Sequence, residues 1–257
     1  MNNEIRSFPV DQMRVQVFAN KDQLGAAAAN YVAGVINDAI HARDQARVIF
    51  ATGASQFEFL NHLIKKPIAW SQVEAFHLDE YVGIPGTHPA SFRRYLRERL
   101  FDLAKPGAVH LLDGTAADLD QECRRYTHLL LEKDIDLACI GIGENGHIAF
   151  NDPPVADFHD PHWVKIVDLD EACRKQQLGE GWFPTLEDVP RQALSLTVPA
   201  ILRARTISCV VPDQRKAQAV KKALQGPVST ACPASILRTS PNVILWLDIP
   251  AASELDA

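Results

Sequence analysis

The chain has 257 residues, 47% of them hydrophobic and 23% charged, which is typical of a globular protein with one large α/β domain or two small ones. Its net charge is -6 and it has no basic run, which argues against nucleic acid as a partner but leaves room for a local anion site. The five cysteines are scattered and form neither a CxxC pair nor a Cys/His ligand spacing, so we expect no disulfide framework and no metal site.

The sequence also lacks the features of an exported or membrane protein. The N-terminal segment has neither a basic region nor an apolar region of the kind found in signal peptides. No apolar run reaches the roughly 18 residues that cross a membrane. With the cysteine usage, this predicts a protein of the reducing cytoplasm without a membrane partner.

Strands and helices alternate along the chain, which predicts an open, mainly parallel sheet with helices on both faces. We expect strands at residues 13–18, 47–51, 73–78, 109–112, 136–142, 193–198, 206–211 and 243–247. We expect helices at residues 21–43, 57–65, 91–101, 117–133, 199–204 and 216–224, the first of them opened by Asn20. Residues 153–189, rich in proline and acidic side chains, are interpreted as a helix-containing flap within a single domain spanning 1–257.

The segment LACIGIGENGHIAFNDP, residues 137–153, begins as a buried strand and breaks into a glycine-rich loop. This loop carries Asn145, His147 and Asp152, and a histidine between an amide and a carboxylate favours proton transfer near neutral pH. A histidine fixed in a buried loop by local hydrogen bonds is the alternative. The glycines also match the GxGxxG pattern of dinucleotide sites, but two prolines follow where that pattern needs a helix, so we do not expect a nicotinamide cofactor.

The first of two further strand ends carries a candidate phosphate site, because ligands of open parallel sheets bind beyond the carboxyl ends of the strands. Thr52, Gly53, Ala54 and Ser55 form a small turn before a predicted helix. Their hydroxyl and backbone N–H groups can hold a phosphate, although an ordinary β–α turn with a capping serine is the alternative.

The second strand end and a later helix carry candidate charged groups. Asp79 and Glu80 follow a predicted strand and can serve as a general base and its neighbour, or form a solvated acidic turn. Lys216 stands at the start of a predicted helix and can reach an anionic ligand, or lie on a solvated helix face.

Together these segments resemble the glucosamine-6-phosphate deaminase (isomerase) family, whose fold is shared with 6-phosphogluconolactonases. The resemblance rests on FATGAS, AFHLDEYVGIPGTHPASFRRYL, LACIGIGENGHIAFNDP and ALSLTVPAILRARTISCVVPDQRKAQAVKKAL, which occur in the family's order across most of the chain. Lactonases usually carry different acidic and histidine motifs, whereas residues 79–81 and 146–151 have the deaminase form.

The resemblance implies that the protein converts an amino-sugar 6-phosphate and water into a ketose 6-phosphate and ammonia, without a metal or an organic cofactor. In the family's pattern Asp79 stands where the base moves a proton from C2 to C1, and His147 stands where a histidine opens the sugar ring. The resemblance also implies that Asn145 and Asp152 orient that histidine, and that residues 52–55 with Lys216 bind the phosphate. The resemblance allows any assembly from a monomer to a homo-oligomer as large as a hexamer.

The sequence departs from the family's better-known pattern at three positions. Asn145 and Asp152 stand where many members have aspartate and glutamate, and the shorter Asp152 would shift the partner of the histidine. Gly181 stands before an aromatic pair, where an arginine usually helps to hold the phosphate. Arg174, one or two helical turns earlier, is the candidate substitute, and these departures leave the identity of the hexosamine open.

Two other functions remain open on the sequence alone. A lactonase-type hydrolase of phosphosugars would hydrolyse 6-phosphogluconolactone and release no ammonia. A phosphosugar-sensing module would bind without turnover, but the chain has no evident helix-turn-helix or basic arm. It also keeps both Asp79 and His147, which a sensor would not need.

Overall fold

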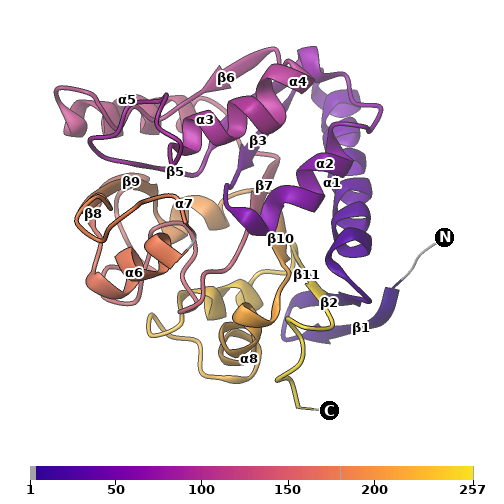
Figure 1. The fold of residues 1–257 in the computed structure, drawn as a ribbon. Coiled ribbons are helices and arrows are strands. Elements are labelled where there is room, and N and C mark those ends of the chain that lie inside the picture. Colours follow the sequence, from indigo (N-terminus) through magenta and orange to yellow (C-terminus); the bar gives the residue numbers. More distant parts are fainter. Residues whose placement is uncertain (1–3, 180, 257) are drawn as a thin grey trace.

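The computed structural model describes residues 4–179 and 181–256, and a large sheet runs through its centre (Figure 1). Within these residues the sheet has eight strands in the order β1-β2-β11-β10-β7-β3-β4-β6. All neighbouring strands are parallel except β1 and β2, which form an antiparallel edge that the sequence did not predict. The strands are β1 (Glu4–Val10), β2 (Met13–Phe18), β3 (Ala46–Phe50), β4 (Val73–His77), β6 (Ala108–His110), β7 (Leu137–Ile140), β10 (Thr206–Val211) and β11 (Val243–Asp248).

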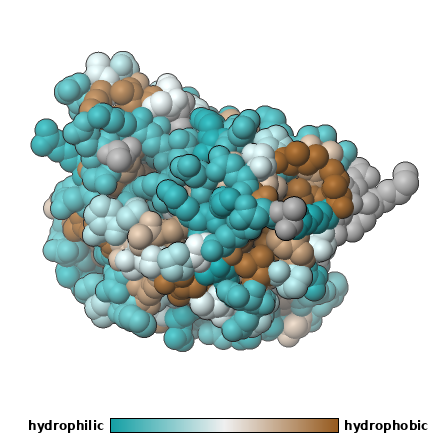
Figure 2. All heavy atoms as spheres, turned by 90° about the horizontal axis from the view of Figure 1, so that it is seen from below, coloured by the Kyte–Doolittle hydropathy of each residue, from teal (hydrophilic) through white to brown (hydrophobic). Residues whose placement is uncertain are grey.

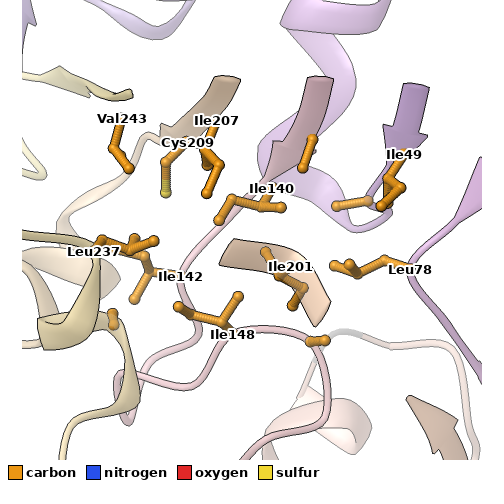
Figure 3. Close-up of a cluster of buried hydrophobic side chains, with 14 of the residues drawn as sticks. Ile49, Leu78, Ile140, Ile142, Ile148, Ile201, Ile207, Cys209, Leu237 and Val243 are labelled. Atoms are coloured by element: carbon orange, nitrogen blue, oxygen red, sulfur yellow. The ribbon is translucent and has the colours of Figure 1, made fainter. Parts of the chain in front are cut away.

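Helices cover both faces of this sheet, as the alternation of strands and helices predicted (Figure 1). Helices α1 (Lys21–Arg43) and α2 (Phe57–Leu63) pack on one face, and α5 (Leu119–Leu131), α7 (Val198–Leu202) and α8 (Ala217–Gln225) pack on the other. The central strands are buried on both sides, so their side chains alternate between two apolar clusters. In β3, Val48 and Phe50 join the cluster under α1, whereas Ile49 joins the other cluster (Figure 3).

Helix α1 shows why the local sequence forms these elements. The Asn20 side chain accepts a hydrogen bond from the Gln23 backbone N–H at 3.0 Å, which confirms the predicted start of this helix. Asp44, at φ 58°, ends it in the left-handed region. The other helices are short: α3 (Phe92–Leu96), α4 (Asp102–Ala104), α6 (Glu171–Gly179), a π turn at Arg97–Phe101, and 3-10 turns at Ala54–Gln56, Trp70–Gln72, Gln214–Lys216 and Pro233–Thr239. Among the residues described, no helix combines the length and the apolar character that a membrane crossing requires.

A second, smaller sheet was not expected from the sequence. Its strands β5 (Asp79–Tyr81), β9 (Gln192–Leu196) and β8 (Val164–Asp168) are antiparallel, in the order β5-β9-β8. The strand predicted at residues 193–198 therefore lies in this sheet and not in the parallel one, and the predicted flap contains β8 as well as the helix α6. These elements bury an apolar cluster of their own, which includes Tyr81, Val167, Cys173 and Ala193. Residues 1–3, 180 and 257 of the predicted domain and flap lie outside the described residues.

The order of the strands creates a switch point at β7. The chain runs from β3 outward to β4 and β6, returns to β7 beside β3, and continues on the other side of β7 with β10 and β11. The connections that leave β3, β7 and β10 therefore diverge over opposite faces of the sheet. In open sheets of this kind a crevice forms beyond the carboxyl ends of the strands at the switch point.

Candidate active site

A cavity of about 310 Å³ lies at this switch point. Its wall combines the loops that follow four strands, namely residues 51–55 after β3, 78–79 after β4, 141–144, 147, 149 and 150 after β7, and 212, 213, 215 and 216 after β10. The structure thus brings together the three strand ends and the lysine that the sequence indicated. Side chains of α1, α2, α3 and α6 complete the wall, and no sequence pattern had indicated them.

The turn after β3 offers backbone donors to the cavity. Gly53 has φ 100°, a conformation that favours glycine, and its carbonyl accepts hydrogen bonds from Gln56 N–H at 3.1 Å and from the Tyr95 hydroxyl at 2.8 Å. Within the described part of the chain, no acceptor is bonded to the backbone N–H of Ala54 or Ser55. Gln56 donates to the Ser55 hydroxyl oxygen at 3.1 Å, so the Ser55 hydroxyl hydrogen can donate to a ligand.

The turn after β10 has the same form. Asp213 has φ 86°, which is strained for a residue with a side chain, and its N–H donates to both carboxylate oxygens of Asp248 at 3.1 and 3.2 Å. The Asp213 carbonyl accepts from Lys216 N–H at 3.0 Å, and its side chain accepts from Arg215 N–H at 3.0 Å. Buried Asp248 holds this strained turn and with it the position of Lys216 on the cavity wall.

Cationic side chains line the same part of the cavity. Besides Lys216, the wall includes Lys21, which pairs with Glu58 at 2.9 Å, and Arg215, whose guanidinium lies 3.8 Å from the Glu144 carboxylate. Lys21 is the first residue of helix α1, which is far in the sequence from Arg215 and Lys216, so no local motif could have indicated that Lys21 lines the cavity. These cations and the free N–H groups give the cavity an end that suits a phosphate.

Asp79 is a buried carboxylate that opens only to the cavity. It begins β5, its residue exposure is 6%, and no hydrogen-bond partner of its side chain exists among the described residues. Burial, and after it the negative charge of Glu80, raises the pKa of Asp79 well above its ordinary value. A carboxylate of this kind is a stronger base than a solvated one, which suits proton abstraction from carbon.

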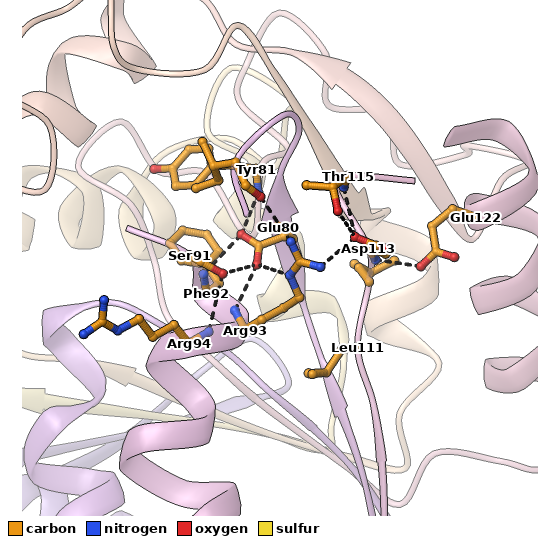
Figure 4. Close-up of polar contacts among 12 residues, drawn as sticks. Glu80, Tyr81, Ser91, Phe92, Arg93, Arg94, Leu111, Asp113, Thr115 and Glu122 are labelled. Atoms are coloured by element: carbon orange, nitrogen blue, oxygen red, sulfur yellow. Dashed lines mark hydrogen bonds and ion pairs between the residues drawn. The ribbon is translucent and has the colours of Figure 1, made fainter. Parts of the chain in front are cut away.

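Glu80, the other carboxylate of the pair, does not line the cavity. Figure 4 shows the polar contacts that it makes instead. It is fully buried and accepts hydrogen bonds from Tyr81 N–H, from Ser91 Oγ, and from the backbone N–H groups of Phe92 and Arg93 at 2.8 to 3.1 Å. Arg93 Nε adds an ion pair at 3.1 Å. Side chains alternate along a strand, so Glu80 points away from the cavity and fixes the start of α3 against β5. Glu80 is therefore not a catalytic neighbour of Asp79, and because both carboxylates are buried, the alternative of a solvated acidic turn is wrong as well.

The glycines of the loop after β7 make room for His147. Gly143 N–H donates to the His147 carbonyl at 2.9 Å, and Gly146, at φ 88°, donates to the Gly143 carbonyl at 3.0 Å. A side-chain carbon on Gly143 would lie 2.2 Å from the imidazole ring of His147. No helix begins at Gly146, so the GxGxxG pattern serves here to seat a histidine.

His147 is held by the two other polar residues of its loop. Its Nδ1 lies 2.9 Å from Asp152 Oδ1, and the Asn145 amide donates to the same oxygen at 2.7 Å. Asn145 Oδ1 accepts from the His147 backbone N–H at 3.0 Å. Because Nδ1 faces Asp152, the opposite nitrogen, Nε2, is the one that can reach a ligand in the cavity.

Asp152 is charged at neutral pH despite its burial. Burial acts to raise the pKa of Asp152, but contacts with His147, Asn145 and the Cys173 thiol outweigh it and bring the pKa below its usual value. The carboxylate therefore stabilises a positive charge on His147 when the ring takes up a proton. Asn145 and Asp152 lie behind the ring and do not line the cavity.

The contact between Gly143 and the ring gives a direct test of this geometry. We expect Gly143→Ala to displace the imidazole and to lower the rate of any reaction that uses it by roughly 100-fold, as misplacement by about 1 Å does elsewhere. Binding of inorganic phosphate should change little. The matched control is Gly34→Ala on exposed α1 surface, where a side-chain carbon meets nothing within 4 Å. Equal activity of the two variants would show that the ring does not need this seat.

Comparisons with known proteins identify the family. The sequence profile of glucosamine-6-phosphate isomerases/6-phosphogluconolactonase matches residues 19–246. Over 206 residues the chain is 38% identical to a glucosamine-6-phosphate deaminase of Streptococcus uberis, covering 80% of this chain and 86% of that protein. The chain belongs to this family.

Solved structures of the glucosamine-6-phosphate isomerase/6-phosphogluconolactonase family share the fold. A monomeric glucosamine-6-phosphate deaminase is 32% identical, with a TM-score of 0.85 over 93% of this chain and 98% of that one. A 6-phosphogluconolactonase from Shewanella baltica is 20% identical, with a TM-score of 0.73 over 91% and 96% of the two chains, and this likeness concerns the fold alone. The resemblance inferred from the sequence motifs is thereby confirmed.

Arg174 does not take the place that the family resemblance suggested for it. Its guanidinium donates to the backbone carbonyls of Leu186 and Val189 and does not line the cavity. The nearby Gly181, at φ 82°, has no side chain to offer. In this member of the family α6 instead presents Gln176 and Gln177 to the cavity, two amides that sequence reasoning did not single out.

Proposed function

We propose that this protein is a glucosamine-6-phosphate deaminase, which converts glucosamine 6-phosphate, or a close epimer such as galactosamine 6-phosphate, and water into a ketose 6-phosphate and ammonia. The observation that carries the proposal is the pairing of two groups in one cavity. Asp79 is a buried carboxylate with a raised pKa, and His147 is a histidine whose reactive nitrogen is aimed by Asp152. Both curated deaminase relatives and the family profile support this reaction class.

Each residue has one part in the proposed reaction. His147 gives a proton to the ring oxygen as the bond between C1 and that oxygen breaks, and the C1 hydroxyl returns a proton to the imidazole, which leaves an aldehyde at C1. Asp79 takes the proton from C2 while O1 gains a proton, which gives an amino-enol with a C1–C2 double bond. Asp79 then returns its proton to C1, the double bond shifts to C2 and nitrogen, and water replaces the nitrogen, which leaves as ammonia.

The phosphate is proposed to bind at the other end of the cavity. The N–H groups of Ala54 and Ser55, the Ser55 hydroxyl and the ammonium group of Lys216 supply donors there, and Thr52 and Gly53 shape the turn. Binding energy from a phosphate remote from the reacting carbons can fix C2 opposite Asp79. We also propose that this chemistry runs in the cytoplasm within one folded unit spanning 1–257, with Asp79 and His147 in place of a cofactor.

The raised pKa of Asp79 predicts the pH dependence of the reaction. Only the ionised carboxylate can take the C2 proton, so activity should rise with pH as Asp79 loses its proton. Because burial and Glu80 raise this pKa, the acid limb of kcat/KM should lie above the ordinary aspartate value of about 4. The measurement is kcat/KM for ammonia release across the acid range. An acid limb at the ordinary value would contradict the assignment of Asp79.

The direct test of the proposed function is ammonia release from glucosamine 6-phosphate, with galactosamine 6-phosphate in parallel. Release from one sugar and not the other would establish the reaction and identify the hexosamine. Hydrolysis of 6-phosphogluconolactone without ammonia from either sugar would instead favour the lactonase function, which shares this fold. Binding of the sugar phosphates without any turnover would favour a sensor.

A further inference from the structure

Helix α6 presents amides, and no cation, to the cavity. Gln176 and Gln177 line the wall, whereas Arg174 of the same helix is bonded to backbone carbonyls outside the cavity. Lys175 lies on the exposed side and pairs with Glu171 at 2.6 Å. The groups that this helix offers to the cavity are therefore neutral amides.

Gln177 is held in one orientation. The Tyr81 hydroxyl donates to Gln177 Oε1 at 2.5 Å, and the two residues are 1% and 6% exposed. The Tyr81 ring is itself fixed, because it packs against Phe92, Phe150 and Phe183 at centroid distances of 4.9, 5.3 and 5.5 Å. A side-chain amide fixed at its oxygen has its nitrogen fixed as well.

The amide nitrogen of Gln177 is left for the cavity. No acceptor is bonded to Gln177 Nε2 anywhere in residues 4–179 and 181–256, although this side chain is nearly buried. Gln177 is one of the residues that line the cavity. Polar groups in such a position are satisfied by water or by a ligand, so Nε2 offers its N–H groups to whatever the cavity binds.

Gln177 belongs to the reacting end of the cavity and not to its cationic end. Four residues before it on the same helix face, the Cys173 thiol hydrogen-bonds Asp152 behind His147. Tyr81, which anchors Gln177, stands two residues after Asp79 in β5. In Figure 1, α6 lies beside β8 and β9, whereas α1 and α2, which border the cationic end, lie apart from it.

We propose that Gln177 determines specificity for the uncharged part of the substrate: its amide N–H donates to a hydroxyl oxygen of the sugar. The identity of the ligand as a sugar phosphate rests on the proposed function. A fixed neutral donor matches a hydroxyl group, while Lys216 and Arg215 face the phosphate charge. Helix α6 thus binds a sugar hydroxyl group near the reacting carbons, and it does not bind the phosphate.

The test compares two ligands on the same variants. Because an active enzyme would consume glucosamine 6-phosphate during the titration, every protein compared carries Asp79→Asn. Dissociation constants of glucosamine 6-phosphate and of inorganic phosphate are measured by calorimetry for this parent and for the parent with Gln177→Met or Gln177→Glu. Loss of one neutral hydrogen bond should weaken sugar-phosphate binding roughly tenfold in Gln177→Met, with phosphate binding unchanged. Gln177→Glu keeps an oxygen for the Tyr81 hydroxyl but loses the N–H groups, so it should fold and show at least the same loss for the sugar phosphate.

Lys175→Gln is the matched control, because Lys175 is exposed on the same helix and outside the cavity. An equal loss for both ligands in Gln177→Met would place Gln177 at the phosphate and overturn the proposal, as would unchanged sugar-phosphate binding in either variant. Ammonia release by the wild type tests the deaminase function separately. A wild type that binds the sugar phosphate without turnover would refute the deaminase and still report on Gln177 through the ratio of the two dissociation constants.

Discussion

Asp79→Asn is expected to lower ammonia release from glucosamine 6-phosphate by about 1000-fold while leaving binding of the sugar phosphate within a few-fold of the wild type. Asparagine has the shape of aspartate but cannot take the C2 proton. The phosphate donors lie on the turns after β3 and β10, away from β5, so they remain in place. The measurements are steady-state ammonia release and calorimetric binding of the sugar phosphate to the inactive variant, set against the KM of the wild type.

The same substitution should make the protein more stable at neutral pH. The pKa of Asp79 is higher in the folded protein than in the unfolded chain, so folding favours the protonated form. Any stability from this group is present below the unfolded pKa and is lost as the pH rises toward the folded pKa. Removing the charge should therefore raise the unfolding temperature at pH 7, and the gain should shrink on acidification.

Asp152→Asn is the matched control, because its expected effect on stability at neutral pH is opposite to that of Asp79→Asn. The folded pKa of Asp152 is depressed, so its contribution to stability is present above the unfolded pKa and is lost as the pH falls through the folded pKa. That variant should unfold at a lower temperature than the wild type at neutral pH.

Near-normal turnover by Asp79→Asn would exclude Asp79 as the C2 base, whatever the effect of this substitution on stability.

The parallel sheet and most of its helices could be predicted because their signals are local. The apolar strands, the Asn20 cap and the glycine-rich ends all act within a few residues. The small sheet could not be predicted in this way, since β5 has three residues and gains its partner β9 from more than a hundred residues away. Pairing over such a distance leaves no periodicity in either segment.

The candidate site shows the same limit. His147, Asn145 and Asp152 stand in one short loop, so the sequence indicated their neighbourhood, and the structure brings them within hydrogen-bonding distance. The separation of Asp79 from Glu80, by contrast, depends on which face of a three-residue strand each side chain takes. Gln177 lines the cavity and Arg174 does not, because of the way α6 packs against Tyr81. The spacing of residues within α6 does not reveal this packing.

His147→Gln should have the second large effect, and it should depend on the form of the substrate. Glutamine can keep a polar contact to Asp152 but cannot exchange a proton near neutral pH, so ring opening loses its acid–base group. We expect ammonia release from cyclic glucosamine 6-phosphate to fall by roughly 100-fold or more. On an analogue that lacks the C5 hydroxyl and cannot close the six-membered ring, much of the activity should return.

The logic of that comparison lies in the division of labour between the two residues. If His147 acts on the ring oxygen and Asp79 on the C2 proton, then a substrate that is already open bypasses His147 and still requires Asp79. Asp79→Asn should therefore be inactive on both forms of the sugar, whereas His147→Gln should be inactive on one. An equal loss of activity by His147→Gln on the cyclic and open substrates would mean that the histidine acts after ring opening, for example on O1 during proton transfer.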